Sequence, residues 1–193
     1  MTADTPPGDP WELLRAWLPA NDDPARPTMT LATVTPDGRP DARIVLLSEY
    51  DDEALYFHTD SRSRKVGQLA EHPDVALVLH IAERRHQLTV QGTASPAPPE
   101  ELRRAYRARS DYLKQLAWQN TVEFAGLPLD DRVSSWARFR DEHADGFGQP
   151  PTWVGYRVVP HRLTFWLGSD DTASRRTEYT LTPEGWAVSV LAG

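Results

Sequence analysis

The chain has 193 residues, no cysteine and a formal net charge of −7 at pH 7. The lack of cysteine excludes disulfides, thiolate catalysis and Cys-ligated metal centres, and the acidic balance disfavours nucleic-acid binding, which needs a basic surface. Because no apolar run reaches the ~18 residues of a membrane span and the Pro-rich N-terminus lacks a signal-peptide pattern, we expect a cytoplasmic protein that binds neither nucleic acid nor membrane.

The N-terminal half predicts one helix followed by antiparallel strands. Asp9 and Pro10 are typical of a helix start, and this helix should end near Trp17, before a polar linker at 20–27. We therefore expect an N-terminal helix and linker over 1–27 and a single domain over 28–193. The expected strands are 29–35, 43–47, 55–59, 75–82 and 87–95, with turns at 36–39 and 49–53 and a helix at 63–71.

The C-terminal half predicts helices first and strands last. The helices are expected at 98–110, 112–124 and 131–142, and the strands at 153–159, 162–167, 177–182 and 186–191. Most connections are too short for parallel crossovers, which need a dozen or more residues. The pattern indicates a mainly β fold with peripheral helices (α+β), in which an antiparallel sheet forms a closed or nearly closed barrel.

The histidines and glycines exclude several kinds of site. None of the six histidines forms an i, i+4 pair or an HExxH motif, so we expect no metal site. Neither a Gly-x-Ser-x-Gly elbow nor a Gly-rich phosphate loop occurs, which disfavours the hydrolase and P-loop classes.

The positive signal is a group of cations at the start of a predicted helix. Arg64 and Lys65 follow Ser63 there, just after a strand that ends at Thr59. The free N–H groups of a helix N-terminus attract anions such as phosphate. The same cations also fit a solvated face paired with nearby acids, and the residues alone leave both interpretations open.

Three residues in the later strands also have two interpretations. Gln87 in its apolar strand is either a ligand-recognising amide or an edge residue facing water. Trp166 either forms the wall of a site for a flat ligand or belongs to the core. Arg176 is either a ligand clamp or a surface cation paired with Glu178.

Considered together, these segments resemble the pyridoxamine 5′-phosphate oxidase family, in the same order, over roughly residues 11–191. The resemblance rests on six motifs: Met29–Val34 with Asp37–Pro40, Arg43–Leu47, Tyr56–Thr59 with Ser63–Lys65, His72–Leu77, Gln87–Ala94, and Trp153–Val158 with Phe165–Gly168.

The resemblance implies an FMN-binding split barrel and a homodimer that holds FMN in clefts between its subunits. It also implies hydride transfer from a small-molecule substrate to flavin N5, followed by reoxidation by O₂; it assigns no catalytic residue here. By motif position, the implied FMN contacts are Arg43, Ile44, Val45, Leu46, Leu47, Ser48, His58, Thr59, Arg64, Lys65, Gln87, Trp166 and Arg176.

The substrate side departs from the family pattern. Ser48 stands where the family has Lys, and 172–174 reads Thr-Ala-Ser where the family has Arg-x-His. The implied substrate contacts are thus Ser48, Tyr106, Arg109, Thr172 and Ser174, with Arg109 one place earlier than usual. Each lost charge-assisted bond to phosphate is worth roughly 1.5–3 kcal/mol, so we expect poor turnover of pyridoxine and pyridoxamine 5′-phosphate.

Four functions remain open. The first is an FMN-dependent oxidase of another small aromatic or heterocyclic compound, like the family's phenazine-pathway members. The second is a true pyridoxal 5′-phosphate synthase in which Arg107, Arg109 or Arg175 compensates for the missing cations. The third is a non-catalytic flavin-binding protein, and the fourth is a split barrel for deazaflavin or haem, which the Ser63–Lys65 segment disfavours.

Overall fold

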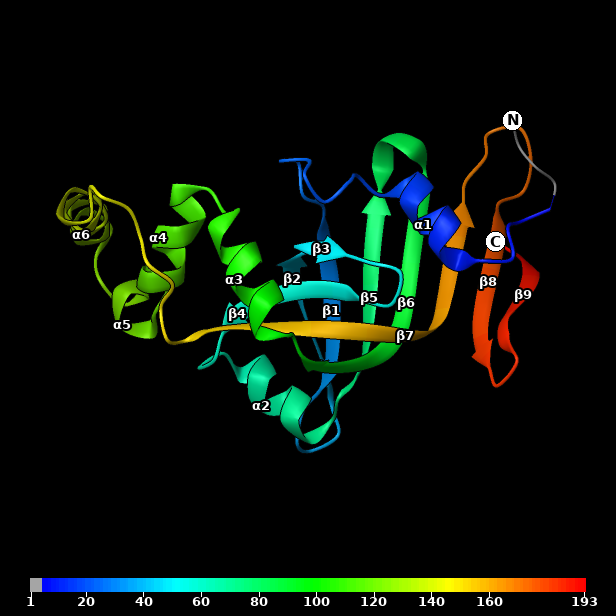
Figure 1. Ribbon diagram of the computed structural model, residues 1–193, viewed down its shortest axis with the longest axis horizontal. Helices are drawn as coiled ribbons and strands as arrows, with labels where there is room; N and C mark the ends of the chain where they lie inside the picture. Colours follow the sequence, from blue (N-terminus) through cyan, green and yellow to red (C-terminus); the bar gives the residue numbers. More distant parts are fainter. Residues whose placement is uncertain (1–4) are drawn as a thin grey trace.

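The computed structural model describes residues 5–193 and is built on one nine-stranded antiparallel sheet (Figure 1). Seven strands follow the order β2-β1-β5-β6-β7-β4-β3, and β8 and β9 extend from β7. The strands are β1 (Thr28–Val34), β2 (Pro40–Leu46), β3 (Glu49–Tyr50), β4 (Leu55–Asp60), β5 (Asp74–Ile81), β6 (His86–Pro96), β7 (Trp153–Leu167), β8 (Arg175–Thr182) and β9 (Gly185–Ala192).

Strand β7 is longer than the sequence predicts. The expected strands 153–159 and 162–167 are one strand of 15 residues, whose first half pairs with β4 and whose second half pairs with β8. The pairing with β6 shifts between Gln91 and Gly92, where Gly92 lies opposite Pro160 and His161 has no partner. A bulge is one of the few places where a sheet accepts proline, and here it bends the strand without ending it.

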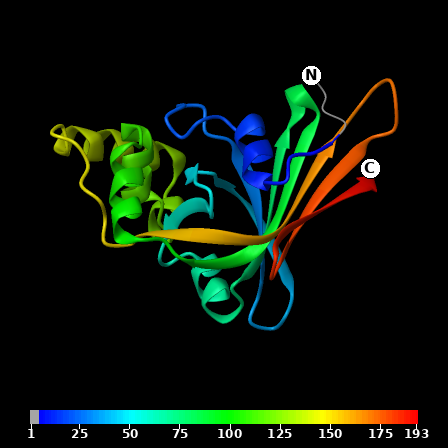
Figure 2. The ribbon, with the colours of Figure 1, turned by 45° about the vertical axis from the view of Figure 1, so that its right-hand side comes forward.

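The helices lie on two sides of the sheet (Figures 1 and 2). Helix α1 lies near β5 and β6, α2 follows β4, and α3 to α6 gather at the opposite end of the molecule from the C-terminus. The helices are α1 (Pro10–Trp17), α2 (Arg64–Glu71), the short η1 (Ala82–Arg84), α3 (Pro99–Arg107), α4 (Asp111–Gln119), α5 (Val122–Ala125) and α6 (Leu129–Glu142).

Two further sequence predictions need correction. The helix expected over 112–124 is broken into α4 and α5, because the Thr121 side chain caps α5 by accepting a hydrogen bond from the Phe124 amide. The acidic turn expected over 49–53 begins as strand β3, which pairs with β4. The turn at 36–39 is confirmed, with Gly38 at a φ of 81°.

The core joins the first helix to the sheet. Trp11, Leu14 and Leu18 from the N-terminal segment pack in the same buried cluster as side chains of the strands. Alternating residues of β1 are buried, as expected for a strand with one face on the core. None of the helices in residues 5–193 is long and apolar enough to cross a membrane.

We predict that Gly92→Ala destabilises the fold by about 1–3 kcal/mol, because a Cβ there would lie 2.4 Å from the Val159 carbonyl oxygen. Denaturant unfolding gives the free energy. Gly67→Ala is the matched control: it lies within α2 with open space around it, and the substitution should stabilise by about 0.5–1 kcal/mol. Equal effects of the two substitutions would contradict this description of the bulge.

Candidate functional site

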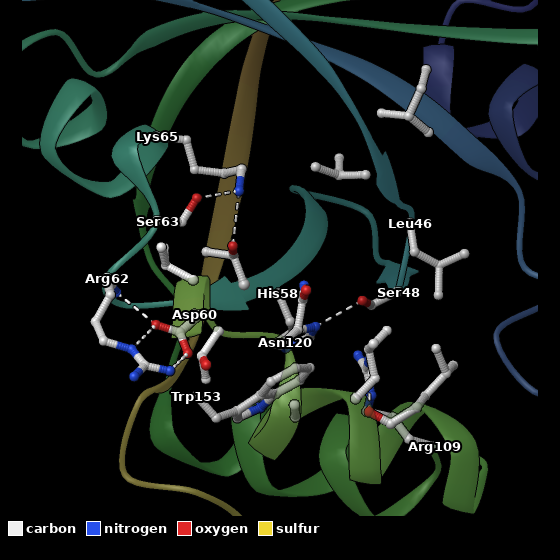
Figure 3. Close-up of a pocket in the computed structure, with 18 of the residues that line it drawn as sticks. Leu46, Ser48, His58, Asp60, Arg62, Ser63, Lys65, Arg109, Asn120 and Trp153 are labelled. Carbon is white, nitrogen blue, oxygen red and sulfur yellow. Dashed lines mark hydrogen bonds and ion pairs between the residues drawn. The ribbon is translucent and has the colours of Figure 1, made fainter. Parts of the chain in front are cut away.

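A cavity of about 740 Å³ lies between the sheet and the helices that follow α3. Its sheet side is formed by the end of β2, by β4 and by the start of α2, and its helical side by α4, α5 and the segment between them (Figure 3). The lining includes six residues that the sequence implied as cofactor contacts outside the cation group: Ile44, Val45, Leu46, Ser48, His58 and Thr59. Leu47, by contrast, is fully buried in the core.

At one side of this cavity, Lys65 is a cation without an acidic partner among the residues that the structure describes. Its Nζ donates hydrogen bonds to Thr59 Oγ1 at 3.0 Å and to Ser63 Oγ at 2.6 Å, and it forms no ion pair with a carboxylate of residues 5–193. Burial lowers the pKa of Lys65, and the charges of Arg43 and Arg64 lower it further. A half-buried ammonium held only by hydroxyl groups is a good receptor for an anion.

Arg43 and Arg64 are placed differently from Lys65. Both form ion pairs with Asp41, at 2.6 Å and 3.0 Å, and neither lines the cavity. Arg43 also donates to Thr33 Oγ1, while the side chain of Arg64 is 77% exposed. Hydrogen bonding from Gln68 is the largest of the effects that hold the pKa of Asp41 below its usual range. In this structure Lys65 is therefore the member of the predicted cation group that faces the cavity.

His58 lies at the back of the cavity as a buried, neutral imidazole. Ser48 Oγ lies 2.7 Å from its Nδ1, and Glu101 lies 3.2 Å from its Nε2. The ring stacks on Trp153 at 4.9 Å and lies so close to Gly155 that a Cβ there would meet it at 2.8 Å. Burial lowers the pKa of His58 to about 4, and the charge of Arg109 adds to this effect.

Arg109 is a second cation without an acidic partner in the described part of the chain, and it lies on the opposite side of the cavity from Lys65 (Figure 3). Its guanidinium packs over the Trp153 ring at 4.3 Å, and burial lowers its pKa to about 10. One nitrogen donates to the Leu113 carbonyl at 3.4 Å, while Nε is buried without a hydrogen-bond partner. Arg109 forms no ion pair within residues 5–193 and keeps its positive charge at neutral pH.

The remaining implied contacts lie outside this cavity. The buried Tyr106 donates its hydroxyl hydrogen to the Gly148 carbonyl at 2.7 Å. Gln87 lies opposite Trp166, and Trp166 lies opposite Arg176, so these three form a row across β6, β7 and β8. The loop before β8 carries Thr172 and Ser174.

The row and the cavity are far apart in one subunit. Gly155 of β7 pairs with His58, and Trp166 lies eleven residues further along the same strand. At about 3.3 Å per residue, this separation is roughly 35 Å along the strand. The implied cofactor contacts therefore fall into two separate groups.

Several site residues could not be found from the sequence. Glu101 is buried beneath His58, Trp153 lies under both His58 and Arg109, and the apolar wall of α4 and α5 includes Leu113, Leu116 and Val122. No spacing in the sequence links these residues to Lys65 or Ser48. For Glu101 the sequence did hold one signal: this acidic residue lies on the buried side of the amphipathic helix α3, where a charged side chain is unusual.

Comparisons with known proteins give a consistent result. The family model described as pyridoxamine 5′-phosphate oxidase matches residues 13–139, and the model described as the pyridoxine 5′-phosphate oxidase C-terminal dimerisation region matches residues 153–193. A pyridoxine/pyridoxamine 5′-phosphate oxidase of Burkholderia multivorans is 38% identical, with 95% of this chain and 86% of the relative covered. One of Sphingopyxis alaskensis is 35% identical, with 95% and 87% covered.

Solved structures agree with this result. PhzG from Burkholderia lata, in complex with tetrahydrophenazine-1-carboxylic acid, has a TM-score of 0.81 and 28% identity, covering 98% of this chain and 95% of that one. An FMN-binding protein from Nostoc punctiforme has a TM-score of 0.66 and 21% identity, covering 86% and 88%, and supports the fold. The antiparallel split barrel is thus confirmed, and this chain belongs to the pyridoxamine 5′-phosphate oxidase family of oxidoreductases.

Proposed function

We propose that this protein is an FMN-dependent oxidase of a small, flat heterocycle that carries one anionic group, with pyridoxine 5′-phosphate and pyridoxamine 5′-phosphate as the first candidates. One observation carries the proposal: Lys65 and Arg109, two partly buried cations without acidic partners among the described residues, face one cavity from opposite sides. One cation suits the phosphate of a cofactor, and the other suits the anionic group of a substrate.

The Lys65 side of the cavity fits the phosphate of FMN. Lys65, Thr59 and Ser63 offer an ammonium and two hydroxyl groups at the start of α2. Ser63 is the N-cap residue, but its side chain does not cap the helix, so the first amides of α2 remain open to an anion. FMN supplies a two-electron acceptor that O₂ can reoxidise, while the protein binds and orients the reactants.

The Arg109 side of the cavity fits the anionic group of a substrate. Its guanidinium lies over the Trp153 ring, beside the apolar wall that includes Leu113 and Leu116. Arg109 supplies part of the positive charge that the family's Lys would supply at the position of Ser48. The names of the relatives favour a phosphorylated B6 vitamer over the unphosphorylated compounds that the substitutions in the sequence suggested.

A carboxylate on a partly reduced heterocycle is the second candidate substrate. Ser48 is uncharged and the cavity wall is apolar, which suits a larger ring better than a phosphate held by several cations. Arg109 can pair with a carboxylate as well as with a phosphate. The carboxylic acid bound to PhzG is a compound of this kind.

A second copy of the chain would complete the cofactor site. Gln87, Trp166 and Arg176 lie too far along the sheet to reach a cofactor bound at Lys65 of the same subunit. The region from 153 to 193 matches the dimerisation model, and its strands expose Leu181, Val190 and Leu191. We therefore propose a homodimer in which each site takes this row from the partner subunit.

We predict that Lys65→Ala weakens FMN binding at least about tenfold, because it removes one charge-assisted contact. Arg64→Ala should have a smaller effect, since Arg64 is already paired with Asp41. Titration of the apo-protein with FMN, followed by flavin fluorescence, measures both changes. Arg39→Ala, at an exposed arginine paired with Asp37, is the control. Unchanged affinity in Lys65→Ala would remove the phosphate site from the proposal.

We predict that Arg109→Gln raises the KM for pyridoxine 5′-phosphate by about 10- to 100-fold and leaves FMN affinity unchanged, because the substrate loses its buried cation. Aerobic formation of pyridoxal 5′-phosphate provides the assay. An unmodified protein that forms no pyridoxal 5′-phosphate, but whose flavin is bleached anaerobically by partly reduced heterocyclic carboxylates, would favour the second candidate. An unchanged KM in the variant would contradict the role of Arg109.

A further inference from the structure

A chain of neighbouring polar side chains leads from the cavity to the surface. It begins at Ser48 Oγ, which lines the cavity and lies 2.7 Å from His58 Nδ1 (Figure 3). His58 Nε2 lies 3.2 Å from Glu101, and the side chains of Glu101 and Glu49 lie close enough that each perturbs the pKa of the other. Arg104, whose side chain is 63% exposed, donates to Glu49 at 2.8 Å and ends the chain at solvent.

The inner members of this chain are deeply buried. The side chains of His58 and Glu101 are 1% and 4% exposed. Burying ionisable groups costs free energy unless they are paired or used, so their location inside the fold needs a reason. The sequence resemblance implies nothing about Glu101 or Glu49, and the proposed binding of FMN and substrate does not require them.

Protons in this chain can be shared between neighbouring groups. Burial lowers the pKa of His58 and raises the pKa values of Glu101 and Glu49, so the imidazole is neutral and two carboxyl groups can share one proton. The charged groups around His58 are Glu101 of α3, Glu49 of β3 and Arg109, which follows α3. Trp153 covers one face of the ring.

The hydrogen-bond directions follow from the carboxylate. An ionised Glu101 can only accept, so His58 Nε2 must donate to it and Nδ1 must be the acceptor. Nδ1 therefore accepts the hydroxyl hydrogen of Ser48. This tautomer leaves both lone pairs of Ser48 Oγ available to a molecule in the cavity.

We propose that Ser48, His58, Glu101 and Glu49 form a proton relay between the cavity and solvent, with Ser48 Oγ as the atom that takes a proton from the bound substrate. The inference rests on the proposed function. The substrate O–H or N–H bond breaks and its proton passes to Ser48, whose own proton passes to His58 Nδ1. The Nε2 proton passes to Glu101, and Glu49 releases a proton beside Arg104.

The relay carries only the proton. The electron pair of the substrate C–H bond leaves as a hydride to the cofactor of the proposed function, so no charge accumulates on His58. Ser48 is then a catalytic residue, since it contacts the substrate. His58, Glu101 and Glu49 act through it as positioning residues.

The first test needs no turnover. In the FMN-loaded protein with ¹⁵N-labelled histidine, His58 should be neutral and protonated on Nε2 at pH 7. His58→Gln identifies its signals. Ser48→Ala should shift the Nδ1 signal, because that nitrogen loses its hydrogen bond. A ring protonated on Nδ1 in the unmodified protein would overturn the relay, because Ser48 could not then pass its proton to His58.

The second test measures anaerobic flavin reduction by saturating pyridoxine 5′-phosphate. With FMN saturating, Ser48→Ala and Glu101→Gln should each slow reduction about 10- to 100-fold. Ser48→Thr keeps the hydroxyl group and should restore most of the rate. The double variant should be no slower than the slower single variant, because the groups act as a unit. Ser134→Ala, at an exposed position on α6, is the control.

The two tests separate the relay from the proposed function. Full reduction rates in Ser48→Ala and Glu101→Gln would overturn the relay while leaving the oxidase intact. If pyridoxine 5′-phosphate and partly reduced heterocyclic carboxylates all fail to reduce the flavin of the unmodified protein, the proposed function is wrong. In that case the first test still applies, because the tautomer of His58 shows the direction of the hydrogen bonds without any substrate.

Discussion

Strand β7 is the constraint on which the rest of the structure depends. It pairs along its length with β6, and along its two halves with β4 and β8. It stays continuous because the β6–β7 bulge accommodates Pro160 and because Gly92 lets the two backbones approach closely. The same strand begins at Trp153, under the cavity, and ends beyond Trp166, in the distant row. Its length therefore separates the two groups of implied cofactor contacts.

Unpaired charge is the second organising feature of the molecule. Most cations near the cavity have carboxylate partners: Arg43 and Arg64 share Asp41, and Arg62 is paired with Asp60. Lys65 and Arg109 have none among the described residues, although burial disfavours their charged forms. A bound anion would offset that cost at each position, which is why these two residues are central to the proposed function.

The sequence predicted much of the sheet and the family, because strands, turns and helix starts are local patterns. The motif from 63 to 65 led to Lys65, and the structure shows its contacts with Thr59 and Ser63. Local patterns could not predict that Arg43 and Arg64 turn toward Asp41, because that depends on side chains brought together by folding. The local patterns also predicted two strands on either side of Pro160, where the structure has the single strand β7.

Contacts between distant segments explain what the sequence missed. Glu101 and His58 are 43 residues apart, and no periodicity relates them. Arg109 is positioned by its contact with Trp153, which is the first residue of β7. The departures at Ser48, Thr172 and Ser174 were visible in the sequence, and Arg109 was implied there as a substrate contact, but its packing on Trp153 was not.

A mixed-subunit experiment tests the composite cofactor site most directly. Lys65→Ala changes one proposed half of the site and Arg176→Ala the other, so each homodimer should bind FMN weakly. Heterodimers formed by co-expressing the two variants under different affinity tags carry both changes in one site and leave the other intact. The account predicts one tight FMN site in each purified heterodimer. Heterodimers that bind FMN no better than either homodimer would contradict a site shared between subunits.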